Sequence, residues 1–246
     1  MILPATGKNH FILLMDILGF SDICKYKDPE TIYSVVNRLF QKGILWQGRD
    51  IGFKVLYFSD TIMFYQKGNL PICQAFNDLY VIASQIFTML ASESIPLRGA
   101  ITYGEFVTRL DSSSTTDLFY GKALAEAADL EKKKKWLGIV ISKQAIDVLD
   151  SDHQRILKSE NVVAQSDAFY LLNPFIHIRS SIGCDLFELR DDYDYQEELK
   201  AIKFIKAQSE NLKLEYEVLN KYTNTVLFIK RIFDKELHPQ IWELIE

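Results

Sequence analysis

The pattern of apolar and polar positions predicts a chain that alternates strands and helices. Five consecutive apolar residues, Phe11 to Met15, run into a single carboxylate at Asp16. An apolar run of this length that ends in Gly and Ser is typical of a strand buried on both faces. The chain then turns at Leu18-Gly19, and Ser21 or Asp22 can cap a following helix. Asp16 is therefore expected where a buried strand ends and a helix begins, although an aspartate there also fits a plain capping role.

A second carboxylate is predicted at the tip of a hairpin. Two short apolar runs between Phe53 and Tyr65 meet at Ser59-Asp60. Their length and their aromatic and β-branched content predict two strands joined by a tight turn. Apolar residues recur at helical spacing on either side, over residues 22–43 and 71–93. Asp60 is thus expected in a turn between two helical segments.

The order of these elements predicts a ferredoxin-like core. Arg98 to Gly104 is interpreted as a central strand, with Glu105 to Leu110 as its hairpin partner. Strand, helix, strand, strand, helix, strand is the split β-α-β arrangement, which places the first strand beside the hairpin. Asp16 and Asp60 are therefore expected to approach each other. Beyond this core, residues 168–172 are interpreted as a strand and residues 192–233 as one or two long helices.

Composition and charge narrow the class of protein. The chain has 246 residues, 48% hydrophobic and 25% charged, which suits one domain or a core domain with an appended segment. The net charge of -5 argues against broad binding to nucleic acid. Three cysteines (Cys24, Cys73 and Cys184) and four histidines follow no metal-ligand spacing, so none is assigned to a site. No signal-peptide pattern and no membrane-spanning apolar run occurs, which predicts a cytoplasmic protein without a membrane partner.

The motifs of the chain resemble, in order, those of class III nucleotidyl cyclase catalytic domains. Asp16 to Ser21, with the pattern Asp-Ile-x-Gly-Phe-Ser, is similar to the first metal-binding motif of the family. Leu97 to Glu105 resembles a family strand that ends in a glycine-containing turn. Tyr120 to Glu131 resembles the helix that follows, and Gly138 to Ser142 resembles the strand after it. Each motif is only moderately specific, whereas the ordered set over residues 10–150 is far more so.

This resemblance implies both a fold and a site. The fold is α+β, a ferredoxin-like class III cyclase core with a mixed, mainly antiparallel sheet and packed helices. The catalytic domain would span residues 1–175, and a mainly helical extension over residues 176–246 would pack on the core or on a dimer partner. Asp16 and Asp60, with the carbonyl of Ile17, would hold two Mg²⁺ or Mn²⁺ ions. The substrate would be a nucleoside triphosphate, bound between the two subunits of a homodimer.

Further residues are candidates for contacts with the nucleotide. A phosphate cradle is expected at the helix start, formed by the backbone N–H groups of Leu18, Gly19, Phe20 and Ser21. Arg98 and Lys122 are candidate phosphate contacts, with a surface salt bridge and a solvated lysine as the ordinary interpretations. Tyr57, beside the metal turn, could stack on a base or simply belong to the core.

The chain differs from the family at the residues that recognise the base and at those that stabilise the transition state. The positions aligned with a transition-state Asn and Arg are Ala125 and Asp129. Of the polar pair that reads a purine in the family, the first position falls at Leu56. The second falls at Leu118, or at Asp117 if the register shifts by one. Neither purine pair is present.

Two explanations stay open at this point. The protein is either a catalytically inactive cyclase-homology module that binds nucleotide or mediates dimerisation, or a member of a divergent branch. Two acidic groups beside a phosphate site repel each other and the phosphate, at a cost in free energy, unless a metal ion neutralises them. The presence of both carboxylates therefore favours the divergent branch. The branch it most resembles is the bacterial Pycsar pyrimidine cyclases, which convert CTP or UTP to the cyclic monophosphate in antiphage defence. A narrow pocket lined by Leu56, Tyr57 and Leu118 would then exclude purines by size. Between the two pyrimidine nucleotides we expect UTP rather than CTP, although no particular residue accounts for this choice.

Overall fold

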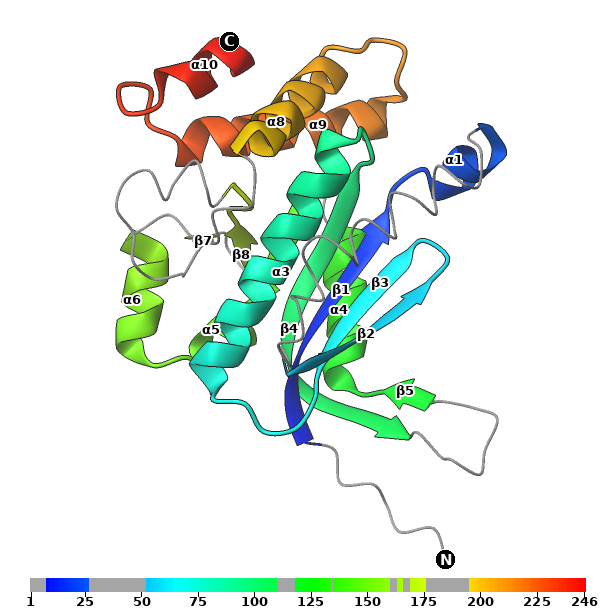
Figure 1. Ribbon diagram of the computed structural model, residues 1–246, viewed down its shortest axis with the longest axis vertical. Coiled ribbons are helices and arrows are strands. Elements are labelled where there is room, and N and C mark those ends of the chain that lie inside the picture. The colour runs from blue at the N-terminus through cyan, green and yellow to red at the C-terminus, as the bar shows by residue number, and fades with distance from the viewer. Residues whose placement is uncertain are drawn as a thin grey trace, which may run out of the picture.

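A computed structural model describes residues 8–26, 52–109, 118–133, 135–159, 163–165, 169–175 and 195–246 of the chain (Figure 1). These residues form one sheet with helices packed on both of its faces. The strands are β1 (Lys8–Ile17), β2 (Phe53–Phe58), β3 (Thr61–Gln66), β4 (Leu97–Arg109), β5 (Leu118–Tyr120), β6 (Gly138–Ser142), β7 (Val163–Gln165) and β8 (Phe169–Leu172). The helices are α1 (Phe20–Tyr26), α3 (Ile72–Ser92), α4 (Lys122–Lys133), α5 (Lys143–Asp147), α6 (Ser151–Ser159), α8 (Tyr195–Ser209), α9 (Tyr216–Ile232) and α10 (Pro239–Ile245).

The order of the strands confirms the predicted fold class. The hydrogen-bonded path runs β2-β3-β1-β4-β6-β8-β7, and β5 pairs with β4 off this path. β1 is antiparallel to both β3 and β4, whereas β4 and β6 are parallel. The sheet is therefore mixed and mainly antiparallel, and its β4-β1-β3-β2 portion has the ferredoxin-like order.

β1 is buried on both faces, as its apolar run predicts. Phe11 belongs to the large core on the side of α3, where its ring lies 6.0 Å from that of Phe76. Ile12 points the other way, into a smaller cluster with Ala123 of α4. Both β1 residues have no exposed surface. Because successive strand residues face opposite sides, α3 and α4 cover opposite faces of the sheet (Figure 1).

The predicted hairpin is confirmed. Phe58 of β2 pairs with Thr61 of β3, so the turn consists of Ser59 and Asp60 alone. Ser59 takes a positive φ of 57° to close this two-residue turn. Asp60 thus lies at the tip.

The helical pattern over residues 71–93 is also confirmed, as α3. Its C-terminal end is closed by a Schellman motif, in which the N–H of Ile95 donates to the carbonyl of Leu90 at 2.8 Å and the N–H of Ser94 to that of Ala91 at 3.0 Å. Ser94 takes the positive φ of 62° that this motif requires. A serine thus occupies a position that is more often glycine.

Two local expectations were wrong. Glu105 to Leu110 is not a returning partner strand, because β4 continues without a turn through Gly104 to Arg109. Pairing with the N-terminal part of β1 keeps this portion of β4 extended, since His10 pairs with Gly104 and Lys8 with Phe106. The strand that returns antiparallel to the end of β4 is β5. Similarly, neither Ser21 nor Asp22 caps α1, which begins at Phe20.

The C-terminal helices share the main core. α8, α9 and α10 lie together beside the C-terminal end of α3 (Figure 1), and Ile205, Ile229 and Ile245 belong to the same buried cluster as Phe11. Two long helices, α8 and α9, thus occupy the segment predicted to hold one or two. The helix predicted to end near Gly43 lies mostly outside the described residues. No helix in the described ranges has the length and apolar character needed to cross a membrane.

Candidate functional site

The two candidate metal ligands lie at the same edge of the sheet. Asp16 is the penultimate residue of β1 and pairs with Thr61, the first residue of β3. The N–H of Ile17 donates to the carbonyl of Asp60 at 2.9 Å, so the turn of the hairpin abuts the end of β1. The antiparallel register thus brings Asp16 and Asp60 together from segments that are far apart along the chain.

Asp16 is engaged by Arg98, its register partner on β4. The guanidinium Nη2 of Arg98 lies 3.0 Å from Asp16 Oδ2, and its Nε donates to the same oxygen at 3.1 Å. Nε also forms an ion pair with Glu131, in the last turn of α4. The Asp16 side chain is 22% exposed and that of Glu131 only 5%, so this network is largely shielded from water.

Burial sets the protonation behaviour of Glu131. Burial raises its pKa, and the nearby charge of Asp16 adds to the effect, whereas the positive charge of Arg98 opposes it. Arg98 therefore compensates two carboxylates at once. The sequence left open whether Arg98 contacts a phosphate or forms a surface salt bridge. In the structure Arg98 forms ion pairs, but its side chain is mostly buried rather than on the surface.

A second cation reaches this network from the C-terminal helices. Lys221 of α9 is half-buried, and its pKa is lowered by burial and by the positive charge of Arg98, while Asp16 and Glu131 raise it. α9 is held in place by Thr225, whose hydroxyl accepts from the N–H of Leu137 at 2.9 Å. Lys221 and Glu131 were not singled out from the sequence, because no local pattern reveals that α4 and α9 each bring a charged side chain within electrostatic reach of Asp16.

The expected phosphate cradle is smaller than predicted. The N–H of Leu18 donates to the carbonyl of Pro96 at 2.9 Å, so it is not available to a phosphate. Gly19 has a positive φ of 71°, and its carbonyl accepts from the N–H groups of Asp22 and Ile23. A Cβ built on Gly19 would meet no atom within 4 Å, so the chain is open on that side. Phe20 and Ser21, in the first turn of α1, are the other candidates whose N–H groups could still face a ligand.

The candidate base contacts do not form one pocket within the subunit. Leu56 pairs with Met63 and Tyr57 with Ile62, and these neighbours point to opposite faces of the sheet. Leu56 therefore shares the face of Asp16, whereas Tyr57 packs on the main core. The expectation that both line one narrow pocket was wrong, since adjacent strand residues alternate in direction.

Tyr57 and Leu118 lie in different environments, neither of them shared with Leu56. Burial raises the pKa of Tyr57, and electrostatic interactions with Cys24 of α1 and with Asp60 in the hairpin turn add to this effect. Leu118 of β5 is 49% exposed, and it is the neighbouring Phe119 that packs on Tyr65, with ring centroids 5.6 Å apart.

α4 carries Ala125 and Asp129, the positions that the resemblance aligns with a transition-state Asn and Arg. Ala123 and Ala127 form its buried side, and the carbonyl of Ala123 accepts from the hydroxyl of Thr102 at 2.8 Å. Lys122, Ala125 and Asp129 lie on the exposed side. These three residues therefore lie on the surface of the subunit.

The oxygen donors at the edge of the sheet fit a hard divalent cation. Mg²⁺ and Mn²⁺ prefer carboxylate and carbonyl oxygens, which Asp16, Asp60 and the backbone at Ile17 supply. Because the guanidinium of Arg98 already contacts Asp16 Oδ2, a cation bound at Asp16 would compete with it for that carboxylate oxygen. The set fits the ions expected from the sequence, with this one competing contact.

Comparison with known proteins supports the fold. No protein-family model matches the chain, and no curated protein sequence matches it. Among solved structures, the guanylate cyclase domain of a Catenaria anguillulae protein in complex with GTP is 15% identical, with a TM-score of 0.53 over 68% of this chain and 96% of that one. A dimeric guanylyl cyclase domain from the aquatic fungus Blastocladiella emersonii is 16% identical, with a TM-score of 0.52 over 67% and 96%.

A monomeric structure of the Blastocladiella emersonii domain is 18% identical, with a TM-score of 0.52 over 68% of this chain and 95% of that one. At such identities the likeness concerns the fold. The chain has the fold of class III nucleotidyl cyclase catalytic domains.

Proposed function

We propose that the protein is a metal-dependent nucleotidyl cyclase. The observation that carries this proposal is the meeting of Asp16 and Asp60 at one edge of a class III cyclase sheet, with Ile17 hydrogen-bonded to Asp60. Two carboxylates at adjoining strand ends form an oxygen-rich site for a divalent cation. The cyclase domain in the GTP complex described above has the same fold and binds a nucleoside triphosphate.

The reaction would convert a nucleoside triphosphate to its 3′,5′-cyclic monophosphate and pyrophosphate. The ribose 3′-oxygen attacks the α-phosphorus, the bond from that phosphorus to the leaving pyrophosphate breaks, and the hydroxyl proton passes to solvent. Two divalent ions held by Asp16, Asp60 and the Ile17 carbonyl would lower the pKa of the hydroxyl and neutralise the triphosphate. Backbone N–H groups from Gly19 to Ser21 would bind phosphate oxygens.

Arg98 and Lys221 would supply the remaining positive charge. Both lie within electrostatic reach of Asp16, and both belong to the chain that carries Asp16, whereas the resemblance places the family's cation on the helix aligned with α4 in the partner subunit. With a divalent ion bound at Asp16, the guanidinium of Arg98 would keep only one of its two carboxylate contacts. It would then be free to bind the charge that develops on the leaving pyrophosphate.

We further propose a pyrimidine substrate, UTP or CTP, and a role as a second-messenger synthase of the antiphage type. The argument from the residues is subtractive, since Leu56 and Leu118 cannot make the directional hydrogen bonds that read a purine. Leu56 shares the face of Asp16 and is 37% exposed, so an apolar group is presented there. The protein would act in the cytoplasm, as a homodimer, with its catalytic domain over residues 1–175 and a helical extension over residues 176–246.

The decisive experiment incubates the purified protein with an equimolar mixture of ATP, GTP, CTP and UTP and Mn²⁺, and identifies cyclic products by mass spectrometry. Cyclic UMP or cyclic CMP as the main product is expected. Cyclic AMP or cyclic GMP would leave the cyclase proposal standing and remove the pyrimidine one. No product at all would favour an inactive cyclase-homology module.

Variants of the two aspartates test the assignment of the site. Asp16→Asn and Asp60→Asn remove a charge without changing shape, and each is expected to lower turnover by roughly 10²–10³-fold because cation binding is lost. Asp22→Asn, an exposed carboxylate on α1, is the matched control and should retain activity. Full activity in either site variant would refute the two-ion assignment.

The inactive module is kept as a second candidate because of one specific observation. Arg98 already satisfies Asp16, and the positions aligned with the transition-state Asn and Arg are Ala125 and Asp129. A module of this kind would bind nucleotide without turning it over. Equilibrium binding of UTP in Ca²⁺, measured beside the turnover assay, separates the two candidates.

A further inference from the structure

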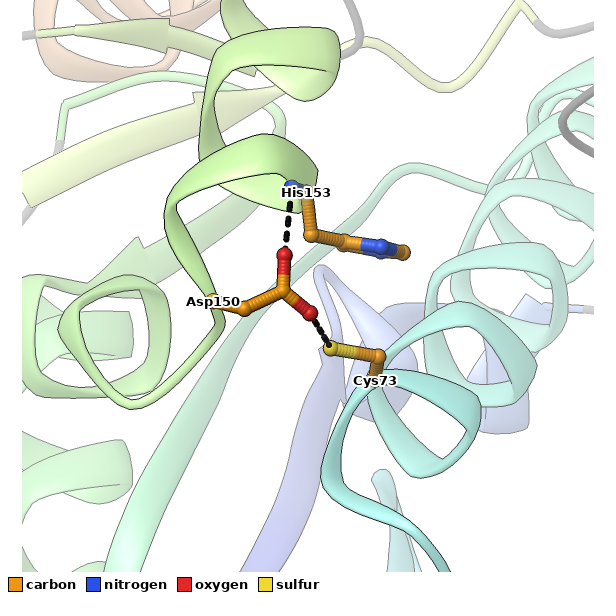
Figure 2. Close-up of side chains that lie close together, drawn as sticks. All are labelled: Cys73, Asp150 and His153. Atoms are coloured by element: carbon orange, nitrogen blue, oxygen red, sulfur yellow. Dashed lines mark hydrogen bonds between the residues drawn. The ribbon is translucent and has the colours of Figure 1, made fainter.

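Three potential metal ligands meet between α3 and α6, away from the candidate nucleotide site. Cys73 lies in the first turn of α3, Asp150 directly precedes α6, and His153 lies in the first turn of α6 (Figure 2). One ligand atom from each side chain lies within 4.8 Å of the other two. Neither the cysteines nor the histidines were assigned a site from sequence spacing, because the two helices that carry them are far apart along the chain.

The donor set suits zinc rather than magnesium. A thiolate, an imidazole and a carboxylate are the ligands that Zn²⁺ prefers, and three protein ligands with one open position form a recurrent tetrahedral arrangement. Zinc bond lengths of that geometry require the donor atoms to be about 3.3–3.6 Å apart. Cys73 Sγ already lies 3.1 Å from Asp150 Oδ2, so closure around an ion needs shifts of only a fraction of an ångström at this pair.

A residue outside the trio orients the histidine. Asn77 lies one turn after Cys73 on α3, and its Oδ1 is 2.8 Å from His153 Nε2. An amide oxygen accepts, so Nε2 is the donor in this contact, and Nδ1 is the ring nitrogen that the neutral imidazole would offer to a metal. Metal-bound histidines typically donate their second ring nitrogen to such a partner, which fixes the tautomer and the orientation of the ring.

The hydrogen bonds that exist without a metal are compatible with this role. Asp150 caps α6 by accepting from the N–H of His153 at 2.7 Å through Oδ1, which leaves Oδ2 for Cys73. Burial raises the pKa of the Cys73 thiol, and its hydrogen bond to Asp150 adds to this. Because zinc binds the thiolate form of cysteine, metal binding would release the proton of the Cys73 thiol.

The trio is separate from the aspartates of the nucleotide site. Asp16 and Asp60 lie at the C-terminal end of β1, beside the hairpin turn, whereas α3 begins after the chain has returned along β3. In Figure 1 the N-terminal end of α3 and the adjacent α6 lie at the end of the sheet opposite α1. An ion here would cross-link α3 to α6, whose ligands Cys73 and Asp150 are 77 residues apart.

We propose that Cys73, Asp150 and His153 bind one Zn²⁺ per chain and thereby tie α6 to α3. This site is independent of the proposed cyclase activity. Its soft sulfur and nitrogen donors select zinc or cobalt, whereas the oxygen donors of the nucleotide site select Mg²⁺ or Mn²⁺.

Cobalt titration of the metal-free protein tests the proposal. Co²⁺ bound to a thiolate in a tetrahedral site gives intense visible bands and a sulfur-to-cobalt charge-transfer band, both of which should saturate at one equivalent and disappear when Zn²⁺ is added. Cys73→Ser should abolish the charge-transfer band, and His153→Gln should abolish stoichiometric binding. Asn77→Leu should weaken binding by about 10–100-fold, as expected when the partner of a ligating histidine is removed.

Matched controls separate this site from other donors. Cys24→Ser, an exposed cysteine on α1, and Asp152→Asn, an exposed carboxylate on α6, should leave the titration unchanged. Asp16→Asn should leave it unchanged as well, which distinguishes the zinc site from the nucleotide site whether or not the protein proves to be a cyclase. Far-ultraviolet circular dichroism of each metal-free variant checks that the fold is retained.

Three outcomes would overturn the proposal. One is the absence of a charge-transfer band in the wild-type protein, which would mean that the trio is a hydrogen-bonded helix cap only. Another is a band that persists in Cys73→Ser, and the third is a band lost in Cys24→Ser.

Discussion

At the scale of single residues, Arg98 balances the charge at the edge of the sheet. Its guanidinium contacts Asp16 and Glu131 together, and the side chains of all three are mostly buried. Removing one partner of a buried ion pair leaves an uncompensated charge, which costs far more than an exposed pair would. Arg98 is therefore expected to matter for stability as well as for nucleotide chemistry.

We predict that Arg98→Leu lowers the free energy of unfolding at neutral pH by about 3 kcal/mol, since Glu131 is left buried without its cation. Urea denaturation measures this change. The double variant Arg98→Leu/Glu131→Gln removes the orphaned charge and should recover part of the loss. A single-variant loss below about 1 kcal/mol, the value of an exposed pair, would contradict the burial of this network.

At the scale of elements, α4 depends on a close approach of its first turn to β4. Gly121 precedes α4 with a φ of 144°, and a Cβ at this position would lie 2.3 Å from the carbonyl oxygen of Glu105. Backbone occupies that space, so a side chain cannot be accommodated by a rotamer change. The glycine therefore sets how closely α4, with Glu131 at its other end, can pack on the sheet.

Gly121→Ala is expected to destabilise the fold by more than roughly 3 kcal/mol, because a forbidden φ and a backbone clash coincide. Gly68→Ala is the matched control, since Gly68 also has a positive φ of 77°, but a Cβ added there would meet no atom within 4 Å. It should cost only about 1 kcal/mol. Equal losses for both variants, in thermal or urea unfolding, would show that the approach of α4 is not limiting.

The packing of α9 on α8 gives a prediction about alkaline pH. Tyr222 of α9 is 5% exposed and packs edge-to-face on Phe204 of α8, with ring centroids 5.8 Å apart. Burial raises the pKa of Tyr222 from 10.0 to about 12. A raised pKa in the folded state means that the native protein holds this proton more tightly than the unfolded chain does.

The stability contributed by the Tyr222 proton is fully present below pH 10.0 and is lost as pH rises towards about 12. Tyr222→Phe, which cannot ionise, should therefore show a weaker decline in unfolding free energy over this window. Urea denaturation at a series of alkaline pH values, wild type against variant, measures the difference. Parallel declines would mean that Tyr222 ionises as readily in the folded protein as in the unfolded one.

At the scale of the whole molecule, exposed apolar side chains lie at separated parts of the sheet. Phe58, at the end of β2 beside the hairpin turn, is 75% exposed, and Tyr120 of β5 is 44% exposed. A head-to-tail dimer would bring such regions of two subunits together around the candidate site. Burial of these side chains would supply part of the driving force.

We predict that the protein sediments at twice its chain mass of 28.5 kDa and that its activity per subunit falls on dilution. Phe58→Glu and Tyr120→Glu should each produce monomers and reduce turnover, because a charge would be buried at the contact. Leu212→Glu, at a residue between α8 and α9 that is 88% exposed, is the control and should change neither property. An active monomer would contradict a site shared between subunits.

The sequence by itself determined the elements whose signal is local. The apolar run of β1, the two short runs of the hairpin and the helical spacing of α3 each report burial within a few neighbouring residues. Their order then predicted that Asp16 and Asp60 would meet, because the ferredoxin-like arrangement admits one place for the hairpin. The fold class followed from the same order.

Apart from the meeting of Asp16 and Asp60, only the tertiary structure decided which distant residues lie together. Gly104 suggested a turn, yet pairing with β1 carries β4 straight through it. Leu56 and Tyr57 were expected in one pocket, but the pleat of β2 sends them to opposite faces. Arg98, Glu131 and Lys221 come from β4, α4 and α9, and Cys73 meets Asp150 and His153 across two helices. Such contacts depend on the packing of helices against the sheet, which no periodicity along the chain records.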